Sequence, residues 1–159
     1  MTIRPYQEQD KSRIVQLFQD FQTYLANLDP MGLIQVDPRY GSLKVQELIT
    51  QLNEENIFLV AQEDSIVIGC VLVSIYTTND IEKIEWSVEK YGEIKELFVD
   101  VEYRAKGVGK KLVEAAEQYV KEKGCGAMFI EVFLPNTSAK QFYEKLGYED
   151  RSVEMMKLL

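Results

Sequence analysis

The chain has 159 residues, a length at which one domain buries about two-thirds of the surface of its unfolded chain. Apolar residues make up 46% and charged residues 28% of the sequence, a balance typical of globular chains. The sequence contains no histidine, which excludes a Ser-His-Asp triad, a Cys-His nucleophile pair and most zinc sites. A net charge of −8 also argues against general nucleic-acid binding, because binding phosphates requires a basic surface. We therefore expect one domain over residues 1–159, with no metal site and no nucleic-acid partner.

Two features of the sequence concern cellular location. The N-terminal residues MTIRPYQEQDKSR lack the apolar core of a signal peptide, and no stretch reaches the roughly 18 apolar residues that a membrane span needs. Cys70 and Cys125 lie far apart and form no CxxC motif, so we interpret them as buried thiols in a reducing compartment. These features predict a cytoplasmic protein without a membrane partner.

The N-terminal half of the chain is predicted to form a strand, two helices and a β-hairpin. A short first strand stops at Pro5. A helix is predicted next, because apolar residues recur at helical spacing as far as Leu28. We expect Asp10 to be its N-cap. After a loop with two Asp-Pro pairs, Ser42 is expected to cap a second helix. The hairpin consists of β-rich runs at 57–62 and 66–76 with a turn at 63–65.

The C-terminal half is predicted to alternate strands and helices after an acidic loop at 77–92. A strand-helix-strand crossover within residues 93–134 requires its two strands to be parallel. The fold class is therefore α/β, a mixed sheet with helices on both faces. The predicted elements are a strand at 93–101, a helix at 107–124, a strand at 127–134, a helix at 137–146 and a strand at 152–158.

The segment 104–111 joins a predicted strand to a predicted helix and is rich in glycine and basic residues. Backbone N–H groups at a helix N-terminus form a ready site for an anion. The segment holds four basic and no acidic side chains, whereas residues 80–102 hold eight acidic and three basic ones. It lacks the GxxxxGK[ST] and GxGxxG patterns of nucleotide-binding loops. A glycine-rich turn with solvated charges is the alternative interpretation.

Two sequence blocks carry a family resemblance. Y-R-A-K-G-V-G-K-K-L, at 103–112, resembles the pyrophosphate loop R/Q-x-x-G-x-G/A of the GNAT superfamily of acyl-CoA N-acyltransferases. N-T-S-A-K-Q-F-Y-E-K-L-G-Y, at 136–148, is similar to the family's later block N-x-x-A-x-x-F/L-Y-x-x-L-G-F/Y. The order of elements also matches over the whole chain. The resemblance implies a mostly antiparallel sheet whose parallel strand pair is split around the cofactor.

The resemblance also implies acetyl-CoA as cosubstrate and assigns its contacts. Backbone N–H groups of residues 105–110 would bind the pyrophosphate, the segment 97–99 would pair with the pantetheine arm, and Asn136 would contact the pantetheine. Lys140 would meet the 3′-phosphate, with a solvated lysine as the alternative, and a helix cap is the alternative for Asn136. The implied cofactor-binding residues are Leu97, Phe98, Val99, Arg104, Ala105, Lys106, Gly107, Val108, Gly109, Lys110, Asn136, Lys140 and Tyr143.

The strand at 93–101 has an irregular pattern. Leu97, Val99 and Val101 are expected to face one way, but Ile94, Glu96 and Phe98 give the other face a mixed character. This ambiguity suits the β-bulge that the family carries here, which opens the sheet for the cofactor. An unbulged strand is the alternative.

Two glutamates are candidates for the general base. Glu131 interrupts the apolar run AMFI-E-VFL, where burial would make it a weaker acid. That change suits a base for an ammonium substrate, and some GNAT proteins use a glutamate at this place. Glu96 is the competitor, because acids beside the splayed strand do this work in other branches. A base-free or water-relayed arrangement is the third possibility.

The resemblance makes Tyr143 the proton donor to the departing thiolate, with a packed aromatic as the alternative. The implied activity is transfer of an acetyl group to a primary amine by direct attack in a ternary complex. The acceptor is an amine of a small molecule, peptide or protein, held by the first two helices, the loop 77–92 with Trp86 and the tail 150–159. A homodimer is the expectation from the family. The rival interpretation is a non-catalytic acyl-CoA-binding or regulatory module.

Overall fold

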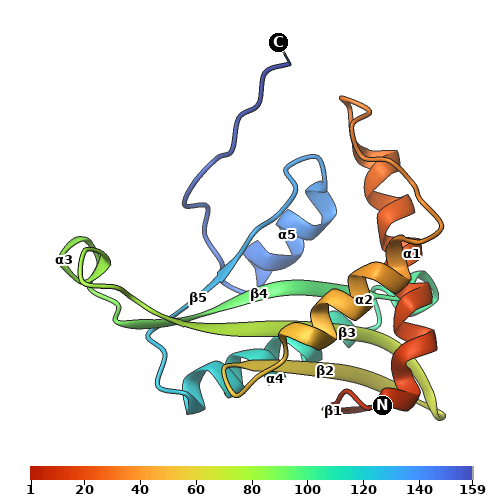
Figure 1. Ribbon diagram of the computed structural model, residues 1–159, viewed down its shortest axis with the longest axis horizontal. Coiled ribbons are helices and arrows are strands. Elements are labelled where there is room, and N and C mark those ends of the chain that lie inside the picture. Colours follow the sequence, from red (N-terminus) through yellow and green to blue (C-terminus); the bar gives the residue numbers. More distant parts are fainter. Residues whose placement is uncertain (159) are drawn as a thin grey trace.

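The computed structural model describes residues 1–158 and is built around one five-stranded sheet (Figure 1). Its strands follow one another in chain order, and each pair is antiparallel except the last, which is parallel. The mixed, mostly antiparallel sheet and its parallel pair are therefore confirmed. The strands are β1 (Thr2–Pro5), β2 (Asn56–Glu63), β3 (Ile66–Thr77), β4 (Lys90–Val99) and β5 (Ala127–Ile130).

Helices cover both faces of this sheet, as predicted. α1 (Lys11–Leu28) and α2 (Tyr40–Gln51) lie on one face, and α4 (Val108–Glu122) lies on the other (Figure 1). α5 (Thr137–Lys145) follows β5 and approaches the start of α4, where Phe142 lies against Gly109, and α3 (Glu82–Glu85) is a single turn before β4. None of the helices within residues 1–158 has the length and apolarity that crossing a membrane requires.

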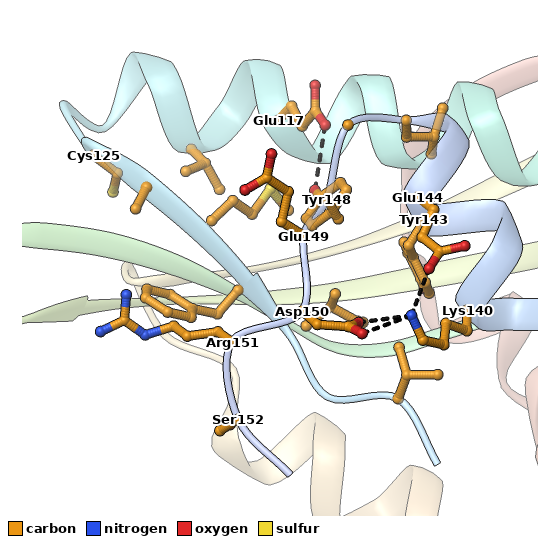
Figure 2. Close-up of a pocket in the computed structure, with 18 of the residues that line it drawn as sticks. Glu117, Cys125, Lys140, Tyr143, Glu144, Tyr148, Glu149, Asp150, Arg151 and Ser152 are labelled. Carbon is orange, nitrogen blue, oxygen red and sulfur yellow. Dashed lines mark hydrogen bonds and ion pairs between the residues drawn. The ribbon is translucent and has the colours of Figure 1, made fainter. Parts of the chain in front are cut away.

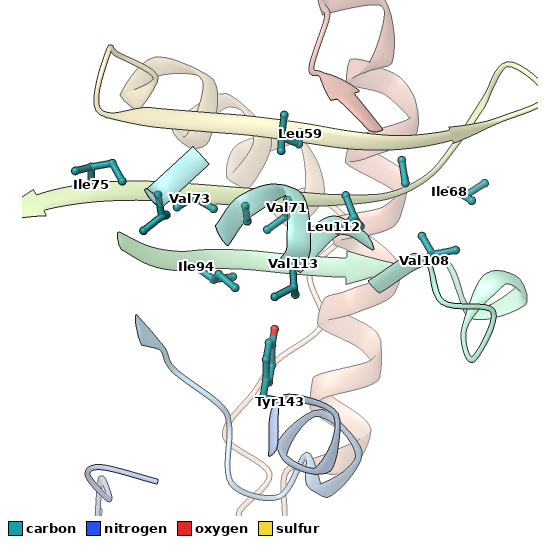
Figure 3. Packing of buried hydrophobic residues seen from close by; sticks show 13 residues of the cluster. Leu59, Ile68, Val71, Val73, Ile75, Ile94, Val108, Leu112, Val113 and Tyr143 are labelled. Atoms are coloured by element: carbon teal, nitrogen blue, oxygen red, sulfur yellow. The ribbon is translucent and has the colours of Figure 1, made fainter. Parts of the chain in front are cut away.

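Each face of the sheet has its own apolar core, and β3 contributes to both. Val71 and Val73 pack toward α4, where Figure 3 shows them beside Leu112 and Val113. Leu72, between them in sequence, packs toward α1 and α2. Because both faces of β3 are covered, its sequence is a continuous apolar run rather than an alternating one.

The strand β4 contains a β-bulge. Leu72 of β3 lies opposite Glu96, but the next residue, Val73, lies opposite Ile94, so Lys95 is the additional residue on β4. The bulge places Ile94 in the core under α4, whereas Glu96 lies on the opposite face toward α2. The predicted bulge is confirmed, and the additional residue explains the mixed pattern of this strand.

Of the two predicted helix caps, one has the right position and one is wrong. Asp10 is the N-cap residue of α1, but its side chain caps no backbone group of that helix; its buried carboxylate pairs with Arg4 at 2.7 Å and accepts from the backbone of Gln7 at 2.9 Å. α2 begins at Tyr40, so Ser42 lies inside the helix and its hydroxyl donates to the carbonyl of Arg39. Both side chains satisfy local hydrogen bonds other than the expected cap, which residue type alone does not distinguish.

Three predicted boundaries on the C-terminal side also differ. β5 ends at Ile130 rather than at residue 134, and the acidic loop at 77–92 includes the short helix α3 and the start of β4. The segment 152–158 forms no strand and is exposed. A period-2 pattern gives a strand only where a neighbouring strand offers backbone partners, and this segment leaves the sheet (Figure 1).

Arg104 connects the loop before α4 to two other parts of the fold. Its guanidinium lies 4.7 Å from the ring centre of Tyr24 on α1 and 5.2 Å from that of Phe98 on β4. Its Nε donates to the carbonyl oxygen of Val99 at 3.0 Å. The planar side chain therefore fixes the loop against the end of β4 and against α1.

We expect Arg104→Lys to lower the free energy of unfolding by about 1–2 kcal/mol, because one ammonium cannot replace two cation–π contacts and the Nε hydrogen bond. Urea unfolding at neutral pH measures this change. The matched control is Arg39→Lys, since Arg39 is exposed and, within residues 1–158, its side chain pairs with Asp37 alone. Equal stability of the two variants would contradict the structural role of Arg104.

Candidate functional site

The candidate site lies where β5 separates from β4. The parallel pairing runs from Tyr91 opposite Ala127 to Ile94 opposite Ile130 and stops there. β4 continues past the bulge to Val99 without β5 beside it. Backbone groups of residues 97–99 on that edge therefore lack a strand partner, and an extended ligand can pair with them.

The loop 104–107 and the start of α4 lie at the end of the same edge. Gly107 precedes the helix with a φ of 83°, in the left-handed region that favours glycine, and Ala105 also has a positive φ of 59°. Lys111 donates to the carbonyl of Gly107, so the amide groups of residues 108–110 are the first of the helix and have no acceptor within it. This arrangement can bind an anion through backbone N–H groups.

Several of the predicted loop residues have contacts within the protein. A Cβ atom on Gly109 would lie 3.3 Å from the ring of Phe142, so this glycine lets α5 pack close to the start of α4. Lys106 lies 4.9 Å over the ring of Tyr103, and Val108 is buried in the core. The side chain of Arg104 is likewise used within the fold. The anion-binding character of the loop therefore rests on its backbone and on its exposed lysines.

Asn136 is buried at the N-terminus of α5. Its Oδ1 accepts from the amide of Ala139 at 3.2 Å, from the hydroxyl of Ser138 at 3.0 Å and from that of Tyr24 at 3.1 Å. The helix-cap interpretation is therefore correct. Among residues 1–158, no acceptor is found for its Nδ2 group, which leaves that amide able to donate to a ligand carbonyl.

Tyr143 lies on the buried face of α5 with Asn136, as the seven-residue spacing predicts. Its ring packs edge-on against Phe142 and Tyr148, with centroids 5.0 and 5.5 Å apart. Figure 3 shows its hydroxyl directed from α5 toward the sheet. Burial raises the pKa of this phenol above its usual value, so the hydroxyl keeps its proton at neutral pH.

Glu96 lies on the α2 face of β4, directly after the bulge. Its side chain is 15% exposed, and its carboxylate forms an ion pair with Lys44 of α2 at 3.1 Å. Burial raises the pKa of Glu96, and the nearby Lys44 ammonium opposes this shift without cancelling it. Glu96 thus has the two properties of a general base for an amine: a pKa above the usual range and a position beside the β4 edge.

Glu131 does not have the predicted environment. The strand ends at the preceding residue, and Glu131 is exposed. The expectation that Glu131 is buried is therefore wrong. Four apolar residues precede it, but the chain leaves the sheet at this point to reach α5, and its carboxylate lies in solvent.

Lys140 has two acidic partners. Its ammonium pairs with Glu144 on the same helix and with Asp150 at 2.8 Å, as Figure 2 shows. These carboxylates raise the pKa of Lys140 and neutralise its charge locally. Lys140 and both carboxylates line a cavity of about 950 Å³, which extends along β5 and also includes Tyr143 and Arg151.

Sequence reasoning missed Lys44 and the role of Arg151. Lys44 occupies a polar position of an amphipathic helix, which carries no sign of an ion pair. The sequence did contain one indication of an ion pair, because the strand at 93–101 has a carboxylate, Glu96, among apolar residues. Such a carboxylate needs a cation or solvent beside it. Arg151 lies in a segment predicted only to border a strand, and its aromatic contacts depend on tertiary structure.

The chain is similar to known acetyltransferases over most of its length. A model of the acetyltransferase (GNAT) family matches residues 5–148. An IAA acetyltransferase of Azospirillum brasilense is 28% identical over 138 residues, which cover 87% of this chain and 78% of that protein. An uncharacterized N-acetyltransferase of Methanocaldococcus jannaschii is 32% identical over 100 residues, 63% of this chain, and the match spans only 42% of that longer protein.

A solved structure shows the same fold at low sequence identity. The aminoglycoside antibiotic 6′-N-acetyltransferase of Acinetobacter haemolyticus superimposes with a TM-score of 0.72 at 18% identity, over 100% of this chain and 99% of that one. The match concerns the fold alone, whereas the family model covers most of the sequence, including both motif blocks. The chain therefore belongs to the acetyltransferase (GNAT) family.

Proposed function

We propose that this protein is an N-acetyltransferase that transfers the acetyl group of acetyl-CoA to a primary amine by direct attack in a ternary complex. One observation carries the proposal: β4 loses its neighbour at the bulge, and the free edge ends at the glycine-rich loop before α4. An edge of free peptide groups next to a cluster of helix N-terminal amides suits a ligand with an extended amide arm and a pyrophosphate. Acetyl-CoA has both parts.

The residues of this edge fit the cofactor in a defined order. Backbone N–H groups of residues 105–110 would bind the pyrophosphate, and the backbone of residues 97–99 would pair with the pantetheine amides. The Nδ2 group of Asn136 is available to donate to a pantetheine carbonyl. Lys140 is not included, because Glu144 and Asp150 already neutralise it.

Glu96 is our choice for the general base. Its raised pKa and its place beside the bulge allow it to accept a proton from the acceptor's ammonium group, directly or through water. A backbone N–H within residues 97–99 would donate to the thioester oxygen and stabilise the negative charge that develops there. Glu131 is retained only as the comparison variant, because its exposure removes the reason for choosing it.

Tyr143 would supply the proton for the departing thiolate. It shares the buried face of α5 with Asn136, its hydroxyl points toward the sheet, and its raised pKa keeps it protonated. Neither cysteine is placed for a covalent mechanism, because Cys70 is fully buried on the α1 and α2 face and Cys125 lies before the start of β5.

The test of the proposal is thiol release from acetyl-CoA across a panel of primary amines, with a calorimetric titration of acetyl-CoA in parallel. An acetyltransferase binds the cosubstrate and releases thiol with at least one amine. Binding without turnover by any amine would support the rival class, a non-catalytic acyl-CoA-binding module. Absence of binding would overturn both interpretations.

We expect Glu96→Gln to lower kcat/KM by roughly 10²–10⁴-fold, because the amide cannot accept a proton. The matched control is Glu131→Gln, which changes an exposed carboxylate at the end of the neighbouring strand and should leave the rate nearly unchanged. Steady-state kinetics measures both. The opposite ranking of the two variants would assign the base to Glu131.

The same base has a pH signature whose sign follows from its ion pair. In the wild type, the acidic limb of the kcat/KM profile should lie above the roughly 4.3 of an ordinary glutamate, because burial raises the pKa of Glu96. Lys44→Met removes the positive charge that holds this pKa down, so the limb should move to higher pH. A limb that stays in place, or that moves to lower pH, would contradict the role of Glu96.

We expect Tyr143→Phe to lower kcat toward the low end of the roughly 10²–10⁴-fold range for acid catalysis, because a thiolate can also leave unaided. KM for acetyl-CoA should change little, since the donated hydrogen bond strengthens as charge builds on the sulfur. Tyr148→Phe is the matched control, a tyrosine of the same cavity whose hydroxyl donates to Glu117 at 3.3 Å. A folded Tyr143→Phe variant with wild-type kcat would make Tyr143 a packing residue.

A further inference from the structure

An aromatic cluster lies on the α1 and α2 face of the sheet, outside the residues that carry the proposed transfer. Tyr76 of β3 stacks on Tyr91 of β4 with centroids 5.4 Å apart, and Tyr91 contacts Phe129 of β5 edge-on at 5.0 Å. Trp86, from the segment between α3 and β4, completes the cluster at 5.6 Å from Phe129 and 6.0 Å from Tyr91. Three adjacent strands and a loop thus present one aromatic surface.

A cation already lies on this surface. The guanidinium of Arg151 is 4.7 Å from the ring centre of Trp86 and 5.8 Å from that of Phe129. Both distances fall within the range of cation–π attraction. Figure 2 shows Arg151 reaching along the cavity, away from the neighbouring Lys140–Asp150 pair. The tail of the chain therefore demonstrates that the Trp86–Phe129 surface accepts a planar cation.

Both acidic and basic side chains lie around the cluster. Glu93 follows Tyr91 on the same face of β4 and lies opposite Phe129 in the parallel register. Burial raises the pKa of Tyr91 and the carboxylates of Glu82 and Glu93 add to this shift, but Glu93 pairs with Lys95 at 3.0 Å and the Lys95 ammonium opposes it. A cation on these rings therefore gains mainly from the ring quadrupoles.

The aromatic surface communicates with the proposed transfer site through one cavity. Trp86, Phe129 and Arg151 line the same cavity of about 950 Å³ as Tyr143. Phe129 lies opposite Glu93 of β4, and Leu97 follows Glu93 by four residues. One of these, Lys95, is the additional residue of the bulge, so the strand advances by about three residues between the two places. At about 3.3 Å per residue, the two places are roughly 10 Å apart, so an extended molecule can reach both.

We propose that the Trp86–Phe129 surface is a subsite for a second cationic group of the acceptor, an ammonium or a guanidinium, and that Arg151 occupies this subsite until the acceptor displaces it. The substrate class is therefore a primary amine that carries another cation roughly 10 Å away. The assignment of this cation to the acceptor rests on the proposed function; the cation-binding property of the surface does not.

Displacement of Arg151 is feasible because little else holds it. Arg151 is exposed, and the ion pairs and hydrogen bonds found among residues 1–158 include none from its side chain. The residues after it, 152–158, are exposed and belong to no strand or helix. An acceptor cation therefore competes with two aromatic contacts and not with a carboxylate pair.

Trp86 is the only tryptophan of the chain, so its fluorescence reports on this surface without any catalysis. We would titrate the protein with straight-chain diamines of increasing length and with the monoamine of each length, at constant ionic strength. Diamines should change Trp86 emission at lower concentration than their monoamines. Arg151→Gln should tighten the diamine response by about threefold to tenfold, since the internal competitor is gone, and Phe129→Leu should weaken it.

The kinetic arm uses the same compounds as acceptors with acetyl-CoA. Phe129→Leu and, as a second variant, Trp86→Leu should raise KM for diamines by about threefold to thirtyfold and leave KM for monoamines and kcat unchanged. The control is Tyr119→Leu, which removes another cation–π partner, that of Lys123, away from the cavity. The preferred diamine length should match the roughly 10 Å between the subsite and Leu97.

The two proposals fail in different ways. Equal fluorescence responses to diamines and monoamines, in the wild type and in Arg151→Gln, would overturn the cation subsite even if amines are acetylated. A selective diamine response without thiol release from acetyl-CoA would overturn the acceptor role and the proposed function while retaining cation binding. Selective binding with unselective turnover would also overturn the acceptor role, because the cation would then not contribute to substrate recognition.

Discussion

One additional residue in β4, Lys95, determines how the two sides of the candidate site are built. Without it, Ile94 and Glu96 would face the same way, and either an aliphatic chain would be exposed or a carboxylate would enter the core under α4. With it, Ile94 joins the core under α4 and Glu96 faces α2. The bulge also coincides with the last pair between β4 and β5. The same local irregularity therefore orients the candidate base and frees the strand edge on which a cofactor can lie.

The environment of Glu96 is a compromise between burial and charge pairing. A half-buried carboxylate is costly, and Lys44 supplies the opposite charge that reduces this cost. The pKa nevertheless remains raised, because desolvation is the larger effect. Burial and the Lys44 ammonium therefore act on this pKa in opposite directions. The position of α2 relative to β4 thus sets the basicity of Glu96, which connects the packing of the N-terminal helices to the proposed chemistry.

The sequence predicted the order of the first elements along the chain, the parallel pair and the bulge, because these follow from periodicity and from the family resemblance. It did not predict the end of β5. AMFI-E-VFL is a continuous apolar run, and such a run does not show where the chain turns away from the sheet, so Glu131 was expected to be buried. The segment 152–158 alternates like a strand, but strand formation depends on a partner edge that no local pattern reveals. Ser42 and Asp10 are good capping residues used for other hydrogen bonds. Each of these errors therefore concerns a property that depends on neighbouring segments of the fold and not on the local sequence.

The two faces of the sheet differ in the part that each would take in the proposed reaction. This difference is the reason for proposing an acceptor with two cations. On the α4 face, Ile94 and Tyr143 belong to a continuous apolar core, which holds α5 in place and keeps charges away. The opposite face carries the rings around Trp86 and two carboxylates, Glu93 and Glu96, each paired with a lysine. An acceptor without a second cation would not use the cation–π attraction of these rings. A molecule with one ammonium near Glu96 and another cation over Trp86 would be oriented along β4, with its reacting nitrogen at the point where β5 departs.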